Sequence, residues 1–502
     1  MNGLLIAPIA LPLGAAVVSV TVRRHLILQR VLSFLAVAAG VLVPGLVLLV
    51  RGLHGEITVV HLGGWSAPLG IVLVADALSS AMVVITGLIG LASIVYSYSG
   101  VDGRRLGLFH PLVTLLLAGV SGAFLTGDLF NLYVWFEVIL IASFGLIVLG
   151  GSALELGAAV KYAALNIVPT TFLLIAVALV YGMTGTLNMA DVARALPGLE
   201  DRTAPRVVFL LLLVAFGSKA AIFPLFFWLP ASYPTPSVPV SALFAGLLTK
   251  VGVYSMYRVF LIVLPQELAE LRWVVGSVAA ATMVVGVLGA LAQDEIRRIL
   301  SFHIISQIGY MVMGIALLTA AGALGGIFYV LHHIIVKTNL FLIGGIAGRV
   351  SGSTELDKMG GLLRSHPGLA ALFVIPAASL AGVPPLSGFW AKLLLVKSGL
   401  DIEAYVLVAL ALVVGLLTLL SMSKIWQKAF WSAPRKQRPE PRSNWVLYLP
   451  VTALSGLTVA IGLYAEVLGR IAERAAVQLF DPASYIDAVL GTTLAIGDGG
   501  TP

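Results

Sequence analysis

The sequence predicts an all-α membrane protein that crosses the bilayer about fourteen times. Of its 502 residues, 59% are apolar and only 11% are charged, whereas soluble domains carry about 25% charged residues. Apolar stretches of roughly 18 to 25 residues recur along the whole chain, and each is long enough to cross a hydrocarbon core of about 30 Å. No segment between them is large enough to form a soluble domain.

The expected spans follow these apolar stretches in chain order. We place them at 3–22, 31–50, 72–98, 109–127, 130–150, 160–182, 206–229, 238–264, 273–292, 299–319, 323–347, 368–396, 402–423 and 445–468. Arg23 and Arg24 follow the first apolar run, whereas a signal peptide has its basic residues before it, so we expect a retained helix. The tenth span is the most interrupted by polar residues, namely Ser301, His303, Ser306 and Gln307.

The basic residues predict the orientation of the chain. Odd-numbered loops hold 17 of the 30 Lys and Arg residues, and the even-numbered loops with the tail hold 8. Because cytoplasmic loops are enriched in basic residues, the odd loops should be cytoplasmic and both termini external. The segment Lys424–Arg442, with six basic residues and one Glu, is the strongest single marker.

Two segments outside the spans are expected to form short helices. The polar tail from Arg470 predicts an amphipathic helix along the outer surface, followed by a disordered "GDGGTP" end. The segment Leu187–Leu196, "LNMADVARAL", is as consistent with a short surface helix as with an ordinary external loop.

Two similar stretches predict an internal repeat. "IVPTTFLL" (Ile167–Leu174) in the sixth span resembles "IVKTNLFL" (Ile335–Leu342) in the eleventh. Five spans separate the copies, and an odd separation inverts the second copy, an arrangement common in transporters. The repeats would be spans 4–8 and 9–13, giving four regions at 1–108, 109–264, 273–423 and 424–502.

Several charged residues fall inside the expected spans, where an ionised group costs about 2.5 to 3.5 kcal/mol or more. The central ones are Glu137, Lys219, Lys250, Lys337 and Lys392. Pro224 breaks the seventh span near Lys219, and Pro384 and Pro385 break the twelfth before Lys392. Since a broken helix frees backbone groups, we expect hydrated cavities that make the lysines tolerable.

Lysine in place of arginine favours proton transfer, because a buried lysine can lose its proton whereas arginine stays charged. Each residue also has a purely structural alternative. Glu137 and Lys219 could form a fixed ion pair, and Lys337 could cap a cavity. Lys250 and Lys392 could extend to an interface. His332 and His333 suit hydrogen-bonded neutral histidines as well as proton relays. We expect Arg258 to reach the membrane surface and Asp76, at the opening of the third span, to have a helix-terminal or packing role.

Four motifs together resemble the antiporter-like subunits of two membrane complexes, respiratory complex I and the Mrp-type sodium/proton antiporters. They are Glu137 in the fifth span, "GSKAAIFPLFFWLP" (217–230), "SALFAGLLTKVGVY" (241–254) and "GVPPLSGFWAKLLL" (382–395). The length and "GGWSAPLGIVLVADALSSAMV" (63–83) are most similar to the D subunits of the Mrp type. The resemblance covers nearly the whole chain.

The resemblance implies roles for the buried residues. Glu137 and Lys219 match the acid–lysine pair of the family, Lys250 the connecting lysine and Lys392 the terminal group. Lys337, His332 and His333 match a region that often holds a polar relay. The implied function is a proton-translocating transporter subunit in a bacterial cell membrane, rather than an enzyme. Its partners would be other antiporter subunits, membrane lipid, protons and Na⁺ or another monovalent cation, and not nucleic acid.

Two other function classes stay open at this point. One is a proton-pumping subunit of a complex I-like oxidoreductase or hydrogenase, and the other is a membrane scaffold whose charges only fix helix packing. The chain has no cysteine and no nucleotide-binding loop, so we expect no cofactor here and any redox chemistry in partners. We see no dense cluster of oxygen ligands within a span, so the route of Na⁺ is open.

Overall fold

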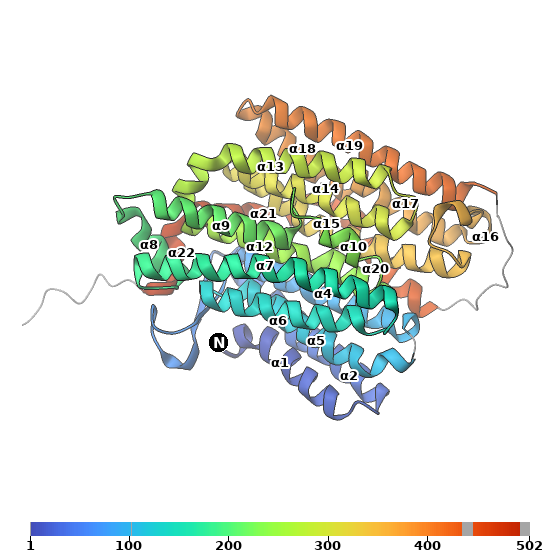
Figure 1. The fold of residues 1–502 in the computed structure, drawn as a ribbon, viewed down its shortest axis with the longest axis horizontal. Coiled ribbons are helices and arrows are strands. Elements are labelled where there is room, and N and C mark those ends of the chain that lie inside the picture. The colour runs from blue at the N-terminus through green and yellow to red at the C-terminus, as the bar shows by residue number, and fades with distance from the viewer. Residues whose placement is uncertain (1, 102, 434–444, 492–502) are drawn as a thin grey trace, which may run out of the picture.

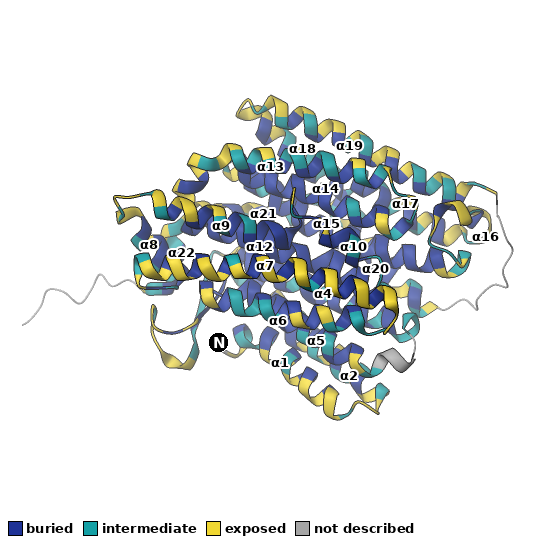
Figure 2. Ribbon diagram, in the orientation of Figure 1, coloured by how far each residue is buried: buried dark blue, intermediate teal, exposed yellow. Residues whose placement is uncertain are grey.

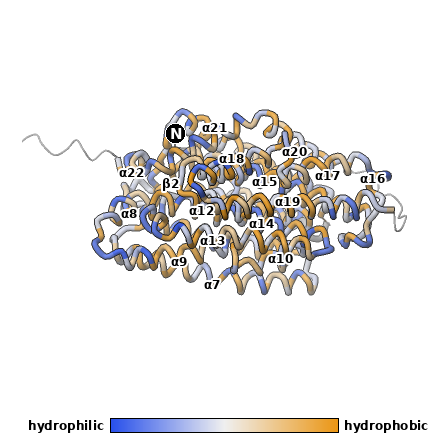
Figure 3. The backbone as a smooth tube through the Cα atoms, turned by 90° about the horizontal axis from the view of Figure 1, so that it is seen from above, coloured by the Kyte–Doolittle hydropathy of each residue, from blue (hydrophilic) through white to orange (hydrophobic). Residues whose placement is uncertain are grey.

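The computed structural model describes residues 2–101, 103–433 and 445–491 as a bundle of long helices (Figure 1). The expected "GDGGTP" end and the second half of the basic segment Lys424–Arg442 lie outside the described residues. Apolar residues fill the middle of the bundle, and polar residues gather at its two ends, near α8 and near α16 (Figure 3). This distribution is that of a protein whose middle sits in hydrocarbon.

The first part of the chain contains four helices, a β-hairpin and two short irregular helices. In order they are α1 (Asn2–Thr21), α2 (Leu26–Val37), η1 (Ala38–Leu42), α3 (Val43–Leu53), β1 (Thr58–His61), η2 (Leu62–Gly64), β2 (Val72–Ala75) and α4 (Ala77–Gly100). The strands pair antiparallel from Thr58 opposite Ala75 to His61 opposite Val72. The third expected span therefore begins too early, because Val72–Ala75 is a strand and the helix starts after Asp76.

The middle part runs from the fourth span to the eighth. Its elements are α5 (Gly103–Leu125), α6 (Leu129–Val148), α7 (Ala153–Thr184), α8 (Met189–Ala195), η3 (Leu196–Gly198), α9 (Thr203–Ala220), α10 (Trp228–Ser232), α11 (Val238–Leu243), η4 (Phe244–Leu248), α12 (Thr249–Arg258) and η5 (Val259–Val263). The segment Leu187–Leu196 does form a helix, α8. It is mostly buried and packs against α22, so it is not a free surface helix.

The last part contains the remaining helices. They are α13 (Pro265–Leu291), α14 (Ile296–Ala316), α15 (Ala320–Ser351), η6 (Leu356–Lys358), α16 (Leu362–Ser365), α17 (Pro367–Ala381), α18 (Ser387–Asp401), α19 (Tyr405–Ile425), η7 (Trp426–Trp431), α20 (Trp445–Leu463), α21 (Ala465–Phe480) and α22 (Pro482–Leu490). The predicted amphipathic tail helix is α21. It begins five residues earlier than Arg470 and packs against α15 and α4.

The described residues contain 13 helices long and apolar enough to span a membrane. The twelfth expected span, 368–396, is present as two shorter helices, α17 and α18, on either side of Pro384 and Pro385. The prediction of about fourteen crossings with breaks in the seventh and twelfth is therefore confirmed. The repeat boundaries at 109–264 and 273–423 stay a prediction.

Burial separates the centre of the bundle from its rim (Figure 2). The most apolar stretch of α15 is entirely buried, whereas only a third of the corresponding stretch of α7 is buried. Glycines let neighbouring helices approach closely at the centre. A methyl group on Gly252 of α12 would lie 2.6 Å from the Ala220 nitrogen of α9. The polar side chains of α12, α14 and α15 therefore lie in the most enclosed part of the molecule.

Candidate functional site

The break in the seventh span leaves backbone groups that side chains satisfy. Helix α9 ends at Ala220, and the chain turns through Ala221, which has a left-handed backbone with φ of 63°. The Phe223 amide donates to Thr282 Oγ1 at 2.9 Å, and Trp228 Nε1 donates to the Ser218 carbonyl at 2.8 Å. Side chains of α13 and α10 thus satisfy these two groups, and the hydrated cavity expected at this break stays a prediction.

Lys219 lies in the last turn of α9 and is buried without a hydrogen bond to any described residue. Its ammonium sits 5.7 Å from the centre of the Phe136 ring on α6. The next residue on α6, Glu137, is half-buried, and no ion pair within 4 Å joins the two described side chains. Glu137 remains within electrostatic range of Lys219. The fixed ion pair considered from the sequence is therefore wrong for this conformation.

Lys250 occupies the centre of the eighth span, directly after the π-helical turn η4. Its side chain is fully buried and donates to the Ala245 carbonyl at 2.6 Å. A π-helical turn widens the helix and is frequent at functional sites. Here the same turn supplies the acceptor that holds the ammonium, so Lys250 reaches no surface.

The eleventh span, α15, carries Lys337, His332 and His333, all buried. Lys337 donates to the Leu300 carbonyl of α14 at 3.1 Å, and His332 Nδ1 lies 2.8 Å from Ser387 Oγ at the start of α18. Neither ring nitrogen of His333 has a partner among the described residues. His332 is thus held by a hydrogen bond at one nitrogen, and His333 by none.

Lys392 lies just after the break in the twelfth span. Its ammonium donates to the carbonyls of Leu380 at 3.1 Å and Ala381 at 2.8 Å, the last two residues of α17. It also lies 5.3 Å from the centre of the Tyr310 ring on α14. The side chain turns toward the break, and the alternative in which it extends to an interface is not observed.

These groups form a chain of neighbours through the bundle. His333 is within electrostatic range of both Lys250 and Lys337. His303 of α14 is within range of Lys337 and Lys392, and His332 is within range of Lys392. Histidines of α14 and α15 therefore lie within electrostatic range of both Lys250 and Lys392. Lys219 is on the adjacent helix, since α9 and α12 touch at Gly252, two residues after Lys250.

Some members of this chain were not singled out from the sequence. His303 Nε2 lies 2.8 Å from Ser421 Oγ, and its other nitrogen is unpaired among the described residues. The Tyr329 hydroxyl donates to Gln307 on α14, and the Tyr329 and Tyr310 rings stack with their centres 5.1 Å apart. Polar residues interrupting the tenth span were the signal for His303 and Gln307. Buried tyrosines carry no such signal.

Arg258 differs from the expectation that it reaches the membrane surface. Its guanidinium pairs with Asp76 at 2.5 Å, and both side chains are at most 3% exposed. Asp76 also caps α4, accepting from the Ser79 amide, which confirms its place at a helix end. The Tyr485 ring of α22 lies 5.3 Å from the Arg258 guanidinium. Sequence reasoning placed Arg258 near a helix end but could not see a partner so far away in the chain.

Many spanning helices, two broken spans and a buried lysine axis define a class of ion-translocating membrane proteins. Residues 126–418 match the family model described as NADH:quinone oxidoreductase/Mrp antiporter, TM. The chain is 44% identical over 494 residues to the D subunit of the Na⁺/H⁺ antiporter of Alkalihalophilus pseudofirmus, covering 98% of this chain and 100% of that protein. It is 40% identical over 493 residues to the corresponding D subunit of Bacillus subtilis, with 98% and 100% coverage. The chain belongs to the family of Na⁺/H⁺ antiporter D subunits.

Solved structures agree with this family. A chain of the Mrp complex from Dietzia sp. DQ12-45-1b superposes with a TM-score of 0.93 and 35% identity, covering 98% of this chain and 100% of that one. A chain of the membrane-bound sulfane sulfur reductase, an archaeal respiratory membrane complex, gives a TM-score of 0.90 at 25% identity, with 97% and 100% coverage. The expected likeness to both antiporter and respiratory subunits is confirmed, with the higher identity on the antiporter side.

Proposed function

We propose that the chain is the proton-translocating subunit of a multisubunit antiporter that exchanges Na⁺, or another monovalent cation, for protons. Protons move along a buried axis of Glu137, Lys219, Lys250, Lys337 and Lys392, with His332 and His333 as relays. The single observation that carries the proposal is the chain of titratable side chains on α12, α14, α15 and α18. The Tyr329 ring lies against both histidines of α15 and stacks on Tyr310, whose ring faces the Lys392 ammonium.

Unpaired polar atoms along this axis support proton movement. Lys219 Nζ, both nitrogens of His333, and Nε2 of His332 have no partner among the described residues, although they are buried. Burying a polar group without a hydrogen bond costs free energy, so water between these atoms would stabilise the arrangement. Water joined to lysine and histidine nitrogens forms a hydrogen-bonded path along which a proton can pass.

The half-buried position of Glu137 supports the proposal that the chain acts within a multisubunit complex. A carboxylate partly exposed on the flank of a spanning helix would face lipid in an isolated chain, which is unfavourable. A neighbouring antiporter subunit covering α6 removes this cost. We infer a multi-pass protein of a bacterial cell membrane with both termini external, as the distribution of Lys and Arg over the loops favours.

The test measures ΔpH-driven Na⁺/H⁺ exchange in everted vesicles carrying the whole complex. Glu137→Gln and Lys219→Ala should each abolish exchange while the complex still assembles. Lys397→Ala serves as the matched control, because Lys397 is exposed on α18, five residues after Lys392. Exchange that survives in both axis variants would leave the residues with a packing role only.

A second candidate is a proton-pumping subunit of a respiratory complex, favoured by the TM-score of 0.90 to the sulfane sulfur reductase chain. The same vesicles separate the two functions. Exchange linked to Na⁺ in the wild type supports the antiporter. Its absence, together with proton pumping driven by an electron donor and co-purifying redox subunits, would favour the respiratory complex.

A further inference from the structure

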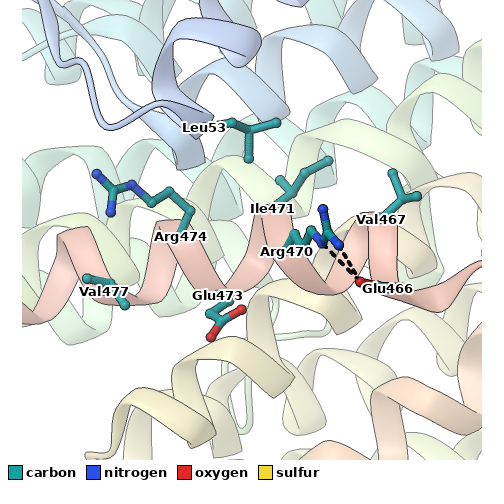
Figure 4. Close-up of a pocket in the computed structure, with 8 residues that line it drawn as sticks. All are labelled: Leu53, Glu466, Val467, Arg470, Ile471, Glu473, Arg474 and Val477. Carbon is teal, nitrogen blue, oxygen red and sulfur yellow. Dashed lines mark hydrogen bonds and ion pairs between the residues drawn. The ribbon is translucent and has the colours of Figure 1, made fainter.

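The tail helix α21 presents a charged stripe on the outside of the bundle. Its exposed charged residues are Glu466, Arg470 and Glu473, spaced four and three residues apart and so on one face. Arg470 pairs with Glu466 at 2.5 Å, whereas Glu473 forms no ion pair within 4 Å with any described residue (Figure 4). The opposite face of α21 packs against α15 and α4.

The position of α21 along the membrane axis makes this stripe unusual. At its start, the Trp390 indole donates to the Gly462 carbonyl at 2.9 Å, and Trp390 is in the first turn after the break of the twelfth span. At its far end, Gln478 accepts from the amide of Ala77, the first residue of α4, at 2.9 Å. Helix α21 thus runs from the level of the break to the start of α4. Its charges lie beside spanning helices, where hydrocarbon would be an unfavourable neighbour.

A groove runs along the side of α21 to which Glu473 points. It has a volume of about 600 Å³ and is lined on the bundle side by Leu324 and Phe328 of α15 and Trp390 and Leu394 of α18. The α21 side supplies Glu466, Arg470 and Glu473. In Figure 4, Glu473 points away from Leu53 and Ile471, which lie on the other flank of the helix. The groove therefore combines an apolar floor with an unpaired carboxylate.

We propose that this groove binds a transmembrane segment of another antiporter subunit, apolar along Phe328 and Leu394 and carrying a Lys or Arg opposite Glu473. The inference rests on the proposed place of the chain in a multisubunit complex. The chemistry favours a protein over an anionic lipid, because two of the three charged side chains that line the groove are carboxylates, which repel a phosphate. An apolar anchor ringed by charged groups is also the usual make-up of a protein interface.

Cross-linking tests the proposal, because the chain has no cysteine and a single introduced one is unique in it. Leu463→Cys places a thiol at the groove on a residue 61% exposed, and Leu416→Cys places one on α19 at a residue 69% exposed. The purified complex is labelled with a thiol-reactive photo-cross-linker, with the complex that carries the unsubstituted chain as background. We expect an adduct with one other subunit from position 463 and not from 416.

Three results would overturn the proposal: a lipid adduct alone at position 463, no adduct there, or the same subunit captured from both positions. A second measurement tests the charge. Glu473→Lys should abolish the adduct formed from position 463, whereas Glu403→Lys, on an exposed loop, should not. An undiminished adduct in the Glu473→Lys complex would show that no cation faces this carboxylate. Neither readout depends on transport, so failure here is distinct from failure of the proton path.

Discussion

The two broken spans use the same sequence device and reach different electrostatic results. Each combines proline with a nearby lysine, at Lys219 in the seventh span and at Lys392 in the twelfth. Lys392 donates to two carbonyls at the end of α17, where the helix dipole also favours a cation. Lys219 is also at a helix end, but its ammonium donates to no described group and lies over the Phe136 ring.

The difference lies in which groups satisfy the freed backbone. At the seventh span, the Trp228 indole donates to the Ser218 carbonyl, and Thr282 Oγ1 accepts from the Phe223 amide. Neither bond involves the Lys219 ammonium. At the twelfth, the lysine itself takes the carbonyls. Lys392 therefore stabilises its break, while Lys219 is free to respond to Glu137 and to water.

The largest expected effect comes from Lys219→Arg. Arginine keeps the charge but cannot release its proton, so exchange should fall about a hundredfold, equivalent to about 2.7 kcal/mol. The measurement is exchange in everted vesicles, with the amount of assembled complex determined in the same samples. A rate near that of the wild type would mean that Lys219 acts only as a fixed charge.

Replacing each lysine by methionine compares how much the two side chains contribute to stability. Lys392→Met should lower the free energy of unfolding by about 2 kcal/mol, because two carbonyls at the end of α17 lose their donor. Lys219→Met should leave stability unchanged or raised, since it removes an unpaired buried charge. The stability of both variants is measured by heating the purified complex and determining, by size-exclusion chromatography, how much of it stays assembled. Equal losses in the two variants would erase the distinction between the breaks.

The smallest expected effect is that of Trp228→Phe. This change removes the indole donor to the Ser218 carbonyl and should cost about 1 kcal/mol of stability. Exchange should persist, because the proton path does not include Trp228. Thermal unfolding and vesicle exchange are the two readouts. Lost exchange in a stable, assembled complex would place the indole in the transport step and contradict this division of roles.

Much of this comparison could be predicted from the sequence. Apolar run lengths located the spans, and Pro224, Pro384 and Pro385 located both breaks. The lysines were visible because charged residues are rare in such runs. How each lysine is satisfied was not predictable, since the Lys219 site depends on Trp228 and Thr282, which come together only in the folded bundle.

Other misses have similar causes. The strand Val72–Ala75 is as apolar as the helix that follows, so hydropathy alone merged the two. The pairing of Arg258 with Asp76 joins residues of the eighth and third spans, and no local pattern reports such a contact. The half-exposed position of Glu137 depends on which helices cover α6, and the sequence contains no signal for that.

The Asp76–Arg258 pair also constrains the order in which the protein can be built. Asp76 is synthesised early and Arg258 midway, whereas Tyr485, whose ring lies against the guanidinium, is among the later residues to leave the ribosome. Gln478, which caps the first amide of α4 beside Asp76, is also late. The surroundings of this pair therefore stay incomplete during most of translation and membrane insertion, and they close only when α21 and α22 dock.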